Sequence, residues 1–151
     1  EKRKEITTEG GLNLKKNKIK IKKTVAALKK AKIRTSLFIN PTIYNIKISK
    51  KIETDCVEIH TGKLSNLVKS NKNYFRELSK IKICSKFANS LNIQVHAGHG
   101  LDYKTTKILS KIKEIEEFNI GHFIVGESVL DGFKKVIKKF KKILNYSSWK
   151  L

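Results

Sequence analysis

The feature that most constrains the fold of this chain is a regular alternation between short apolar segments and longer segments whose apolar residues follow helical spacing. Four short segments are typical of strands, at residues 33–39, 56–60, 93–97 and within 118–125. Segments with helical spacing lie at residues 13–32, 42–51, 73–91, 101–115 and 128–146. Strands that pair in parallel need crossover connections, which helices usually supply. The sequence therefore predicts an α/β fold with four parallel strands and outer helices.

The chain is strongly basic, but its choice of basic residue argues against dedicated nucleic-acid binding. Lys and Arg total 34 against 13 Asp and Glu, which gives a formal net charge of +21. Only three of these basic residues are Arg and 31 are Lys. Nucleic-acid-binding proteins favour Arg for bidentate contacts and interleave aromatic residues, and this pattern is absent here. We interpret the lysines as solvated helix faces and expect only weak, non-specific attraction to polyanions.

Two further classes of protein do not fit the sequence. The apolar runs are far shorter than the roughly 20 residues that span a membrane, so a membrane protein is not expected. Cys56 and Cys84 are too few and too isolated for a disulfide framework or a thiolate metal site, and we expect buried, reduced thiols of a cytoplasmic protein. The chain contains no Met and begins with Glu1, so we expect a processed, truncated or partial product of a longer gene.

Three of the four predicted strands end in a cluster of Gly and His. The clusters lie at residues 58–62, 96–100 and 119–122 and contain all four histidines of the chain, His60, His96, His99 and His122. In parallel α/β folds the carboxyl ends of the strands form the active site. Glycine allows backbone N–H groups to approach a phosphate closely, and the start of a helix adds a positive dipole. The sequence predicts an active site with phosphate-binding loops at this end, and residues 7–11 form another Gly-bearing loop.

Each of these residues also has a purely structural interpretation. Any one histidine could be a hydrogen-bonded structural residue, and any one glycine an ordinary turn residue. Glu58 lies within a predicted strand, where a carboxylate that faces the interior needs a donor partner, which could simply be a lysine, or a functional role. A metal centre could draw on His96 and His99 with Glu58, His60 and His122. We disfavour it because side chains alternate in direction along a strand.

Five segments of the chain together resemble the pyridoxine 5'-phosphate synthase family. They are EKRKEITTEGG, SLFI, VEIHTG, HAGHGLDY and FNIGHFIVG, and they occur in the family's order at compatible spacing. The resemblance covers essentially the whole chain and corresponds to the carboxyl-terminal part of the family's protein. It implies the (β/α)₈ TIM-barrel family, of which this chain carries about the carboxyl-terminal half. We expect residues 1–151 to form a single, partial barrel domain.

The resemblance also implies an enzymatic reaction and the residues that carry it. The family condenses 3-amino-2-oxopropyl phosphate with 1-deoxy-D-xylulose 5-phosphate, closing the pyridine ring of vitamin B6 and releasing phosphate and water. It uses no metal and no organic cofactor. By their match to the family's motifs, His99 is implied as the proton donor and Glu58 as the transition-state stabiliser. The implied substrate contacts are Thr7 for the deoxyxylulose phosphate, and Gly100, Gly121 and His122 for the aminooxopropyl phosphate.

The resemblance further implies that part of the catalytic machinery lies outside this chain. The family's first strands supply additional Asn, Asp, His, Arg and Glu residues, some of them acid–base groups, and half a barrel leaves two open sheet edges. We expect the isolated 151-residue polypeptide to be inactive. Its partners would be small phosphorylated substrates, with homo-oligomers in the full-length family and no specific nucleic acid or membrane. Two alternatives stay open: another phosphate-binding (β/α) barrel enzyme, and a basic nucleic-acid-binding module.

Overall fold

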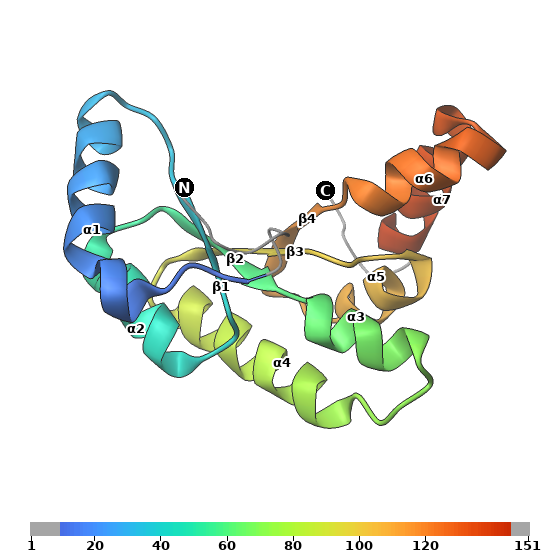
Figure 1. Ribbon diagram of the computed structural model, residues 1–151, viewed down its shortest axis with the longest axis horizontal. Helices are drawn as coiled ribbons and strands as arrows, with labels where there is room; N and C mark the ends of the chain where they lie inside the picture. Colours follow the sequence, from blue (N-terminus) through green and yellow to red (C-terminus); the bar gives the residue numbers. More distant parts are fainter. Residues whose placement is uncertain (1–9, 146–151) are drawn as a thin grey trace.

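The structure is a computed structural model that describes residues 10–145 (Figure 1). In chain order its elements are α1 (Leu14–Lys30), β1 (Ser36–Ile39), α2 (Ile43–Ile52), β2 (Cys56–His60), α3 (Gly62–Lys69), α4 (Phe75–Ser90), β3 (Gln94–Gly98), α5 (Tyr103–Leu109), β4 (Ile115–Asn119), α6 (His122–Asp131) and α7 (Phe133–Asn145). Three helix starts are capped by side chains. The side chains of Asn13, Thr42 and Asp102 each accept a hydrogen bond from a backbone N–H in the first turn.

The four strands form one parallel sheet in the order β1-β2-β3-β4. The register places Phe38, Glu58, His96 and Glu117 in one row across the sheet. A second row, at the carboxyl ends of the strands, contains His60, Gly98 and Asn119. This topology confirms the predicted fold class, a parallel sheet of four strands with helices outside it.

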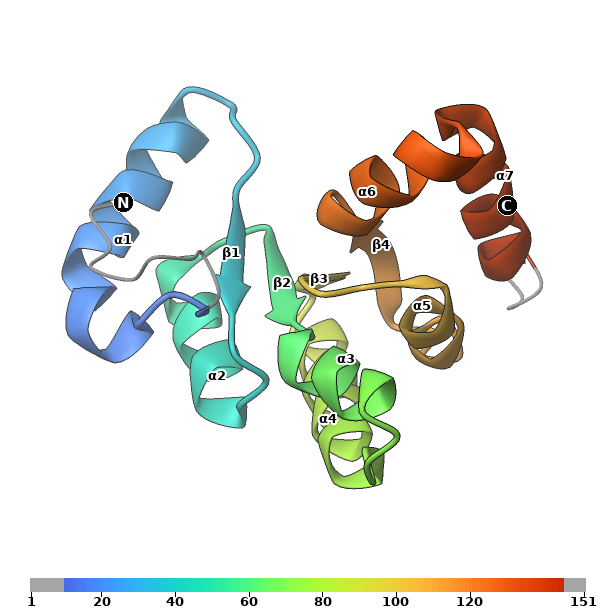
Figure 2. The ribbon, with the colours of Figure 1, turned by 45° about the vertical axis from the view of Figure 1, so that its right-hand side comes forward.

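One face of the sheet is apolar and covered by helices. Figure 1 shows α2, α3 and α4 together on one side of the sheet, and Figure 2 shows α6 and α7 beside β4, at the opposite end from α1. The side chains on the covered face are 6% exposed or less: Leu37, Ile39, Val57, Ile59, Val95 and Ala97. They pack into one cluster with apolar residues of the helices, among them Ile46, Leu64 and Ile81. Burial of this surface is the main stabilising contribution to the fold.

The opposite face of the sheet carries mostly polar side chains. Because side chains alternate along a strand, Glu58 and His60 point away from the face of Val57 and Ile59. Asn119 contacts Glu58, and Glu117 contacts His96, across this face, which we call the open face. The fold therefore separates an apolar layer from a layer of chemically reactive groups.

The elements confirm the prediction for the first three strands and correct it for the fourth. The fourth strand is Ile115–Asn119, whereas the prediction placed it within 118–125, and the predicted helix 101–115 ends at Leu109. Glu116 and Glu117 are exposed, so this strand lacks the apolar character by which the others are recognised.

Two further differences concern helices. The short helix α3 follows β2 directly and was not predicted, because its eight residues contain little more than one turn of apolar spacing. The predicted helix 128–146 is instead the end of α6 followed by α7, with a break at Gly132, whose φ of +78° does not continue a helix.

Two simpler observations complete the description. Cys56 in β2 and Cys84 in α4 are buried free thiols, as the sequence predicts. Within residues 10–145, each helix is too short or too polar to cross a membrane.

Candidate active site

Glu58 lies on the open face with a defined donor partner. Asn119 Nδ2, from β4, donates a hydrogen bond of 2.8 Å to Glu58 Oε2. The carboxylate reaches Asn119 by crossing over Gly98 in the strand between them. A Cβ at Gly98 would lie 1.9 Å from Glu58 Oε1, so this position leaves no space for a side chain unless the carboxylate moves. The partner that the sequence required is thus an amide of β4 rather than a lysine.

Two of the histidines form a stacked pair at the carboxyl ends of β2 and β3. The ring centroids of His60 and His99 are 4.7 Å apart, and the ring planes differ by 21°. Phe38 of β1 lies against the pair, with its centroid 5.2 Å from His60 and 6.4 Å from His99. A Cβ at Gly62 would come within 2.7 Å of both imidazoles, at His60 Cε1 and His99 Cδ2. Glycine at position 62 therefore makes room for the stack.

The backbone that carries His99 has an unusual conformation. His99 has a φ of +79° and Gly100 a φ of +72°. A positive φ is uncommon for a residue with a Cβ, and such conformations persist where surrounding contacts enforce them. Thr61 provides these contacts. Its Oγ1 lies 2.7 Å from the carbonyl oxygens of Gly98 and of His99, its N–H donates to the carbonyl oxygen of Gly98, and Lys69 Nζ donates to that of Gly100.

The start of α6 follows the carboxyl end of β4. Gly121 is the N-cap of α6 and provides no side-chain cap, and His122 is the first residue of the helix. Both residues are exposed. A helix start without a side-chain cap leaves backbone N–H groups available to an anion.

His96 does not join the other histidines, which corrects the expectation that all four lie at the strand ends. It is the third residue of β3 and is 4% exposed. Its Nδ1 lies 3.6 Å from Glu117 Oε1, and its Nε2 lies 3.5 Å from a guanidinium nitrogen of Arg34. Arg34 precedes β1, so His96 takes part in contacts towards the amino ends of the strands.

The remaining predictions for the site divide as follows. Thr7 lies outside the described residues. Among residues 10–145, no group of three or more His, Cys, Asp and Glu is arranged to hold a metal ion.

The sequence analysis missed Phe38, Thr61 and Asn119. Thr61 and Asn119 stand inside the quoted motifs EIHTG and FNIGH, and Phe38 lies two residues from the end of its apolar segment, on the open face.

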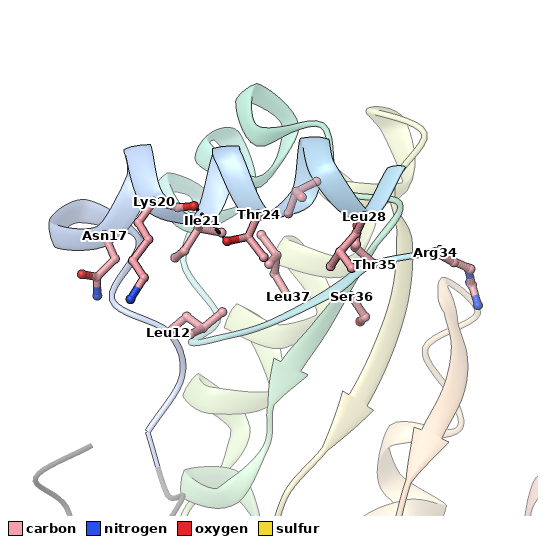
Figure 3. Close-up of a pocket in the computed structure, with 11 residues that line it drawn as sticks. Leu12, Asn17, Lys20, Ile21, Thr24, Leu28, Arg34, Thr35, Ser36 and Leu37 are labelled. Carbon is pink, nitrogen blue, oxygen red and sulfur yellow. Dashed lines mark hydrogen bonds between the residues drawn. The ribbon is translucent and has the colours of Figure 1, made fainter. Parts of the chain in front are cut away.

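A cavity of about 740 Å³ lies elsewhere, between α1 and β1 (Figure 3). Figure 3 shows Leu12, Ile21 and Leu37 pointing towards one another there. The described lining contains none of the predicted site residues. The candidate site is instead the open face at the carboxyl ends of the strands.

Comparison with known proteins agrees with the resemblance seen in the sequence. A family described as "Pyridoxal phosphate biosynthesis protein PdxJ" matches residues 1–146. A pyridoxine 5'-phosphate synthase of Pelagibacter ubique (strain HTCC1062) is 64% identical over 145 residues, which cover 96% of this chain and 61% of the relative. The enzyme of the same name from Prochlorococcus marinus (strain AS9601) is 42% identical over 144 residues, or 95% of this chain and 60% of the relative.

The chain thus spans about 60% of the length of these curated relatives. The match extends over nearly all of this sequence and includes every motif that forms the open face. The chain therefore belongs to the family of the pyridoxal phosphate biosynthesis protein PdxJ.

Proposed function

We propose that the protein of which this chain is a part is a pyridoxine 5'-phosphate synthase. It would condense 3-amino-2-oxopropyl phosphate with 1-deoxy-D-xylulose 5-phosphate to form the pyridine ring of vitamin B6, releasing phosphate and water. One observation carries the proposal beyond family membership. The Glu58 carboxylate and the His99 imidazole both lie on the open face at the carboxyl ends of adjacent strands, which is where (β/α) barrels perform their chemistry.

His99 is proposed as the proton donor. Loss of water requires protonation of a leaving oxygen, and imidazole is the side chain best suited to this at neutral pH. The loop that carries His99 is held by Thr61, which supports a fixed position for the donor.

Glu58 is proposed to stabilise the transition state. The hydrogen bond from Asn119 fixes the carboxylate, and a fixed charge needs no reorganisation when charge develops in the reaction. A carboxylate at this place would favour the positive charge that arises on the condensing nitrogen.

The phosphate groups would be bound at backbone-rich positions. Gly100, Gly121 and His122 are proposed to contact the aminooxopropyl phosphate, supported by the uncapped start of α6. Thr7 is proposed to contact the deoxyxylulose phosphate. These small phosphorylated molecules would be the protein's partners, and the buried free thiols favour action in the cytoplasm.

The decisive experiment is a turnover assay with both substrates on the full native polypeptide that carries this sequence. We expect pyridoxine 5'-phosphate and inorganic phosphate to form together, as measured by mass spectrometry and a phosphate assay. Replacing His99 with Asn should lower kcat by about 100- to 10,000-fold. The exposed Lys86 on α4 offers a control, because Lys86→Gln removes a charge away from the open face.

Two outcomes would contradict the proposal. A folded native polypeptide that forms no product from these substrates, but converts other sugar phosphates, would favour a different phosphate-binding barrel enzyme. Undiminished turnover in His99→Asn would remove His99 from the mechanism. As the sequence leads us to expect, the 151-residue polypeptide assayed alone should give no turnover, because it spans about 60% of the length of its relatives.

A further inference from the structure

We propose that His60 is a positioning residue for His99, which it holds in one orientation by stacking. The catalytic part of this inference rests on the proposed function. The fixed orientation of the His99 ring does not, because it follows from the ring contacts alone. Neither the family match nor the relatives' names give His60 a role.

The first step is the geometry of the stack. With centroids 4.7 Å apart and planes 21° from parallel, the two imidazoles lie face to face. Phe38 lies against His60 at 5.2 Å with a tilt of 42°, so His60 contacts both a phenyl ring and the His99 ring. Contacts of this kind between rings favour defined orientations.

The second step is what orients the His99 side chain. Its backbone is fixed by hydrogen bonds from Thr61 to the carbonyl oxygens of residues 98 and 99, but these bonds do not reach the imidazole. Among the described residues, the His99 ring makes its aromatic contacts with His60 and Phe38. Removing the His60 ring would therefore leave the proton donor free to turn.

The test is NMR of the histidine rings in the full native polypeptide, with signals assigned by single His→Gln variants. In the unmodified protein we expect nuclear Overhauser contacts between the ring protons of His99 and those of His60 and Phe38, as the ring distances require. In His60→Phe, which keeps a flat ring, the contact between His99 and Phe38 should persist, and in His60→Ala it should be lost.

A kinetic measurement separates positioning from simple structural support. His60→Ala should lower kcat by about 10- to 100-fold with little change in KM, since misplacing a catalytic group by about 1 Å has effects of this size. His60→Phe, which keeps a flat ring, should restore most of kcat. Tyr44→Ala removes a half-exposed ring from α2 as the control for loss of an aromatic side chain, and it should leave both quantities unchanged.

The possible outcomes separate this inference from the proposed function. Ring contacts of His99 that are the same in His60→Ala as in the unmodified protein would overturn the stacking role. Equal kcat in His60→Ala and the unmodified protein would overturn the positioning role. Absence of turnover in the unmodified protein would count against the proposed function only, because the ring contacts still test the pair. If His60→Ala fails to fold, the same comparisons are made with His60→Gln, which also removes the ring.

Discussion

The two faces of the sheet are built from alternate residues of the same strands, yet they differ in almost every physical respect. On the covered face, Val57 and Ile59 have no exposed surface and pack against helices. On the open face, Glu58 and His60 contact groups from neighbouring strands through a hydrogen bond and a ring stack. The comparison indicates that the core and the candidate site lie on opposite faces, so residues next to each other in the sequence should respond to substitution in different ways.

The same comparison explains why the open face depends on small residues. A covered face tolerates bulk as long as the apolar volume is filled, whereas the open face must keep space for side chains that cross from one strand to another. Gly98 lies beneath the Glu58 carboxylate and Gly62 beneath the two imidazoles. Both glycines are therefore part of the site, although they contribute no reactive group.

The largest effect is expected for Glu58→Gln, which tests whether the open face serves the reaction rather than the stability of the fold. The variant keeps the shape of the side chain and an oxygen that can accept from Asn119. We expect kcat of the full native polypeptide to fall by about 100- to 1,000-fold, because a fixed charge is lost where charge develops. The free energy of unfolding should change by less than about 0.5 kcal/mol. A large loss of stability with unchanged kcat would reverse the assignment of the two faces.

How far the sequence predicts this separation depends on the strand. For β1, β2 and β3, apolar residues such as Leu37, Val57 and Val95 make the strands recognisable, and the strand ends carry the motifs. For β4, the exposed Glu116 and Glu117 make the strand hard to recognise, because Ile115 is its fully buried apolar residue. Local pattern is informative where one face is apolar, and it fails where most of a strand's residues are exposed.

The site was predictable to a similar degree. The roles of Glu58 and His99 stay predictions from the motifs, whereas the need of Glu58 for a partner followed from the cost of burying a carboxylate. That the partner is Asn119, and that His60 rather than His96 lies against His99, depends on strand register and on the turn at His99. These are tertiary features, which a pattern along one strand does not contain.

The next largest effect is expected for Ile59→Ala, which tests the covered face. In the sequence, Ile59 lies between Glu58 and His60, whose side chains are on the open face. Ile59 is fully buried in the core, so its truncation leaves a cavity. We expect the free energy of unfolding, measured in urea, to fall by about 3 kcal/mol. At a temperature where the variant is folded, kcat should stay within about threefold of the original, as the two faces are separate. A drop in kcat as large as that of Glu58→Gln would show that the faces are coupled.

A titration of Cys84 tests how well the helix layer that packs on the covered face excludes water. Burial raises the pKa of this thiol from its ordinary 9.0 to about 11. Because the folded state prefers the neutral thiol, the associated stability is fully present below pH 9 and is lost as the pH rises towards 11. Compared with Cys84→Ala, the unmodified protein should lose about 2 kcal/mol more of its unfolding free energy across this window. Parallel curves for the two proteins would mean that water reaches the thiol.

The smallest effect is expected at Asp55, which precedes β2 where both faces of the sheet begin. The backbone N–H of Thr35 donates to its carboxylate at 2.8 Å, and this bond, aided by the Thr35 hydroxyl, holds the pKa of Asp55 below its usual value of 3.8. A lowered pKa means that the stabilisation is present above about pH 4 and is lost as the pH falls further. Asp55→Asn keeps an acceptor for the same bond but has no charge to lose. The difference in unfolding free energy between the two proteins should therefore shrink by no more than about 1 kcal/mol between pH 5 and pH 2.5, because a partly exposed carboxylate is screened by water. A larger change would mean that this end of the sheet excludes water as well as the covered face does. The two faces would then not be separate at this end of the sheet.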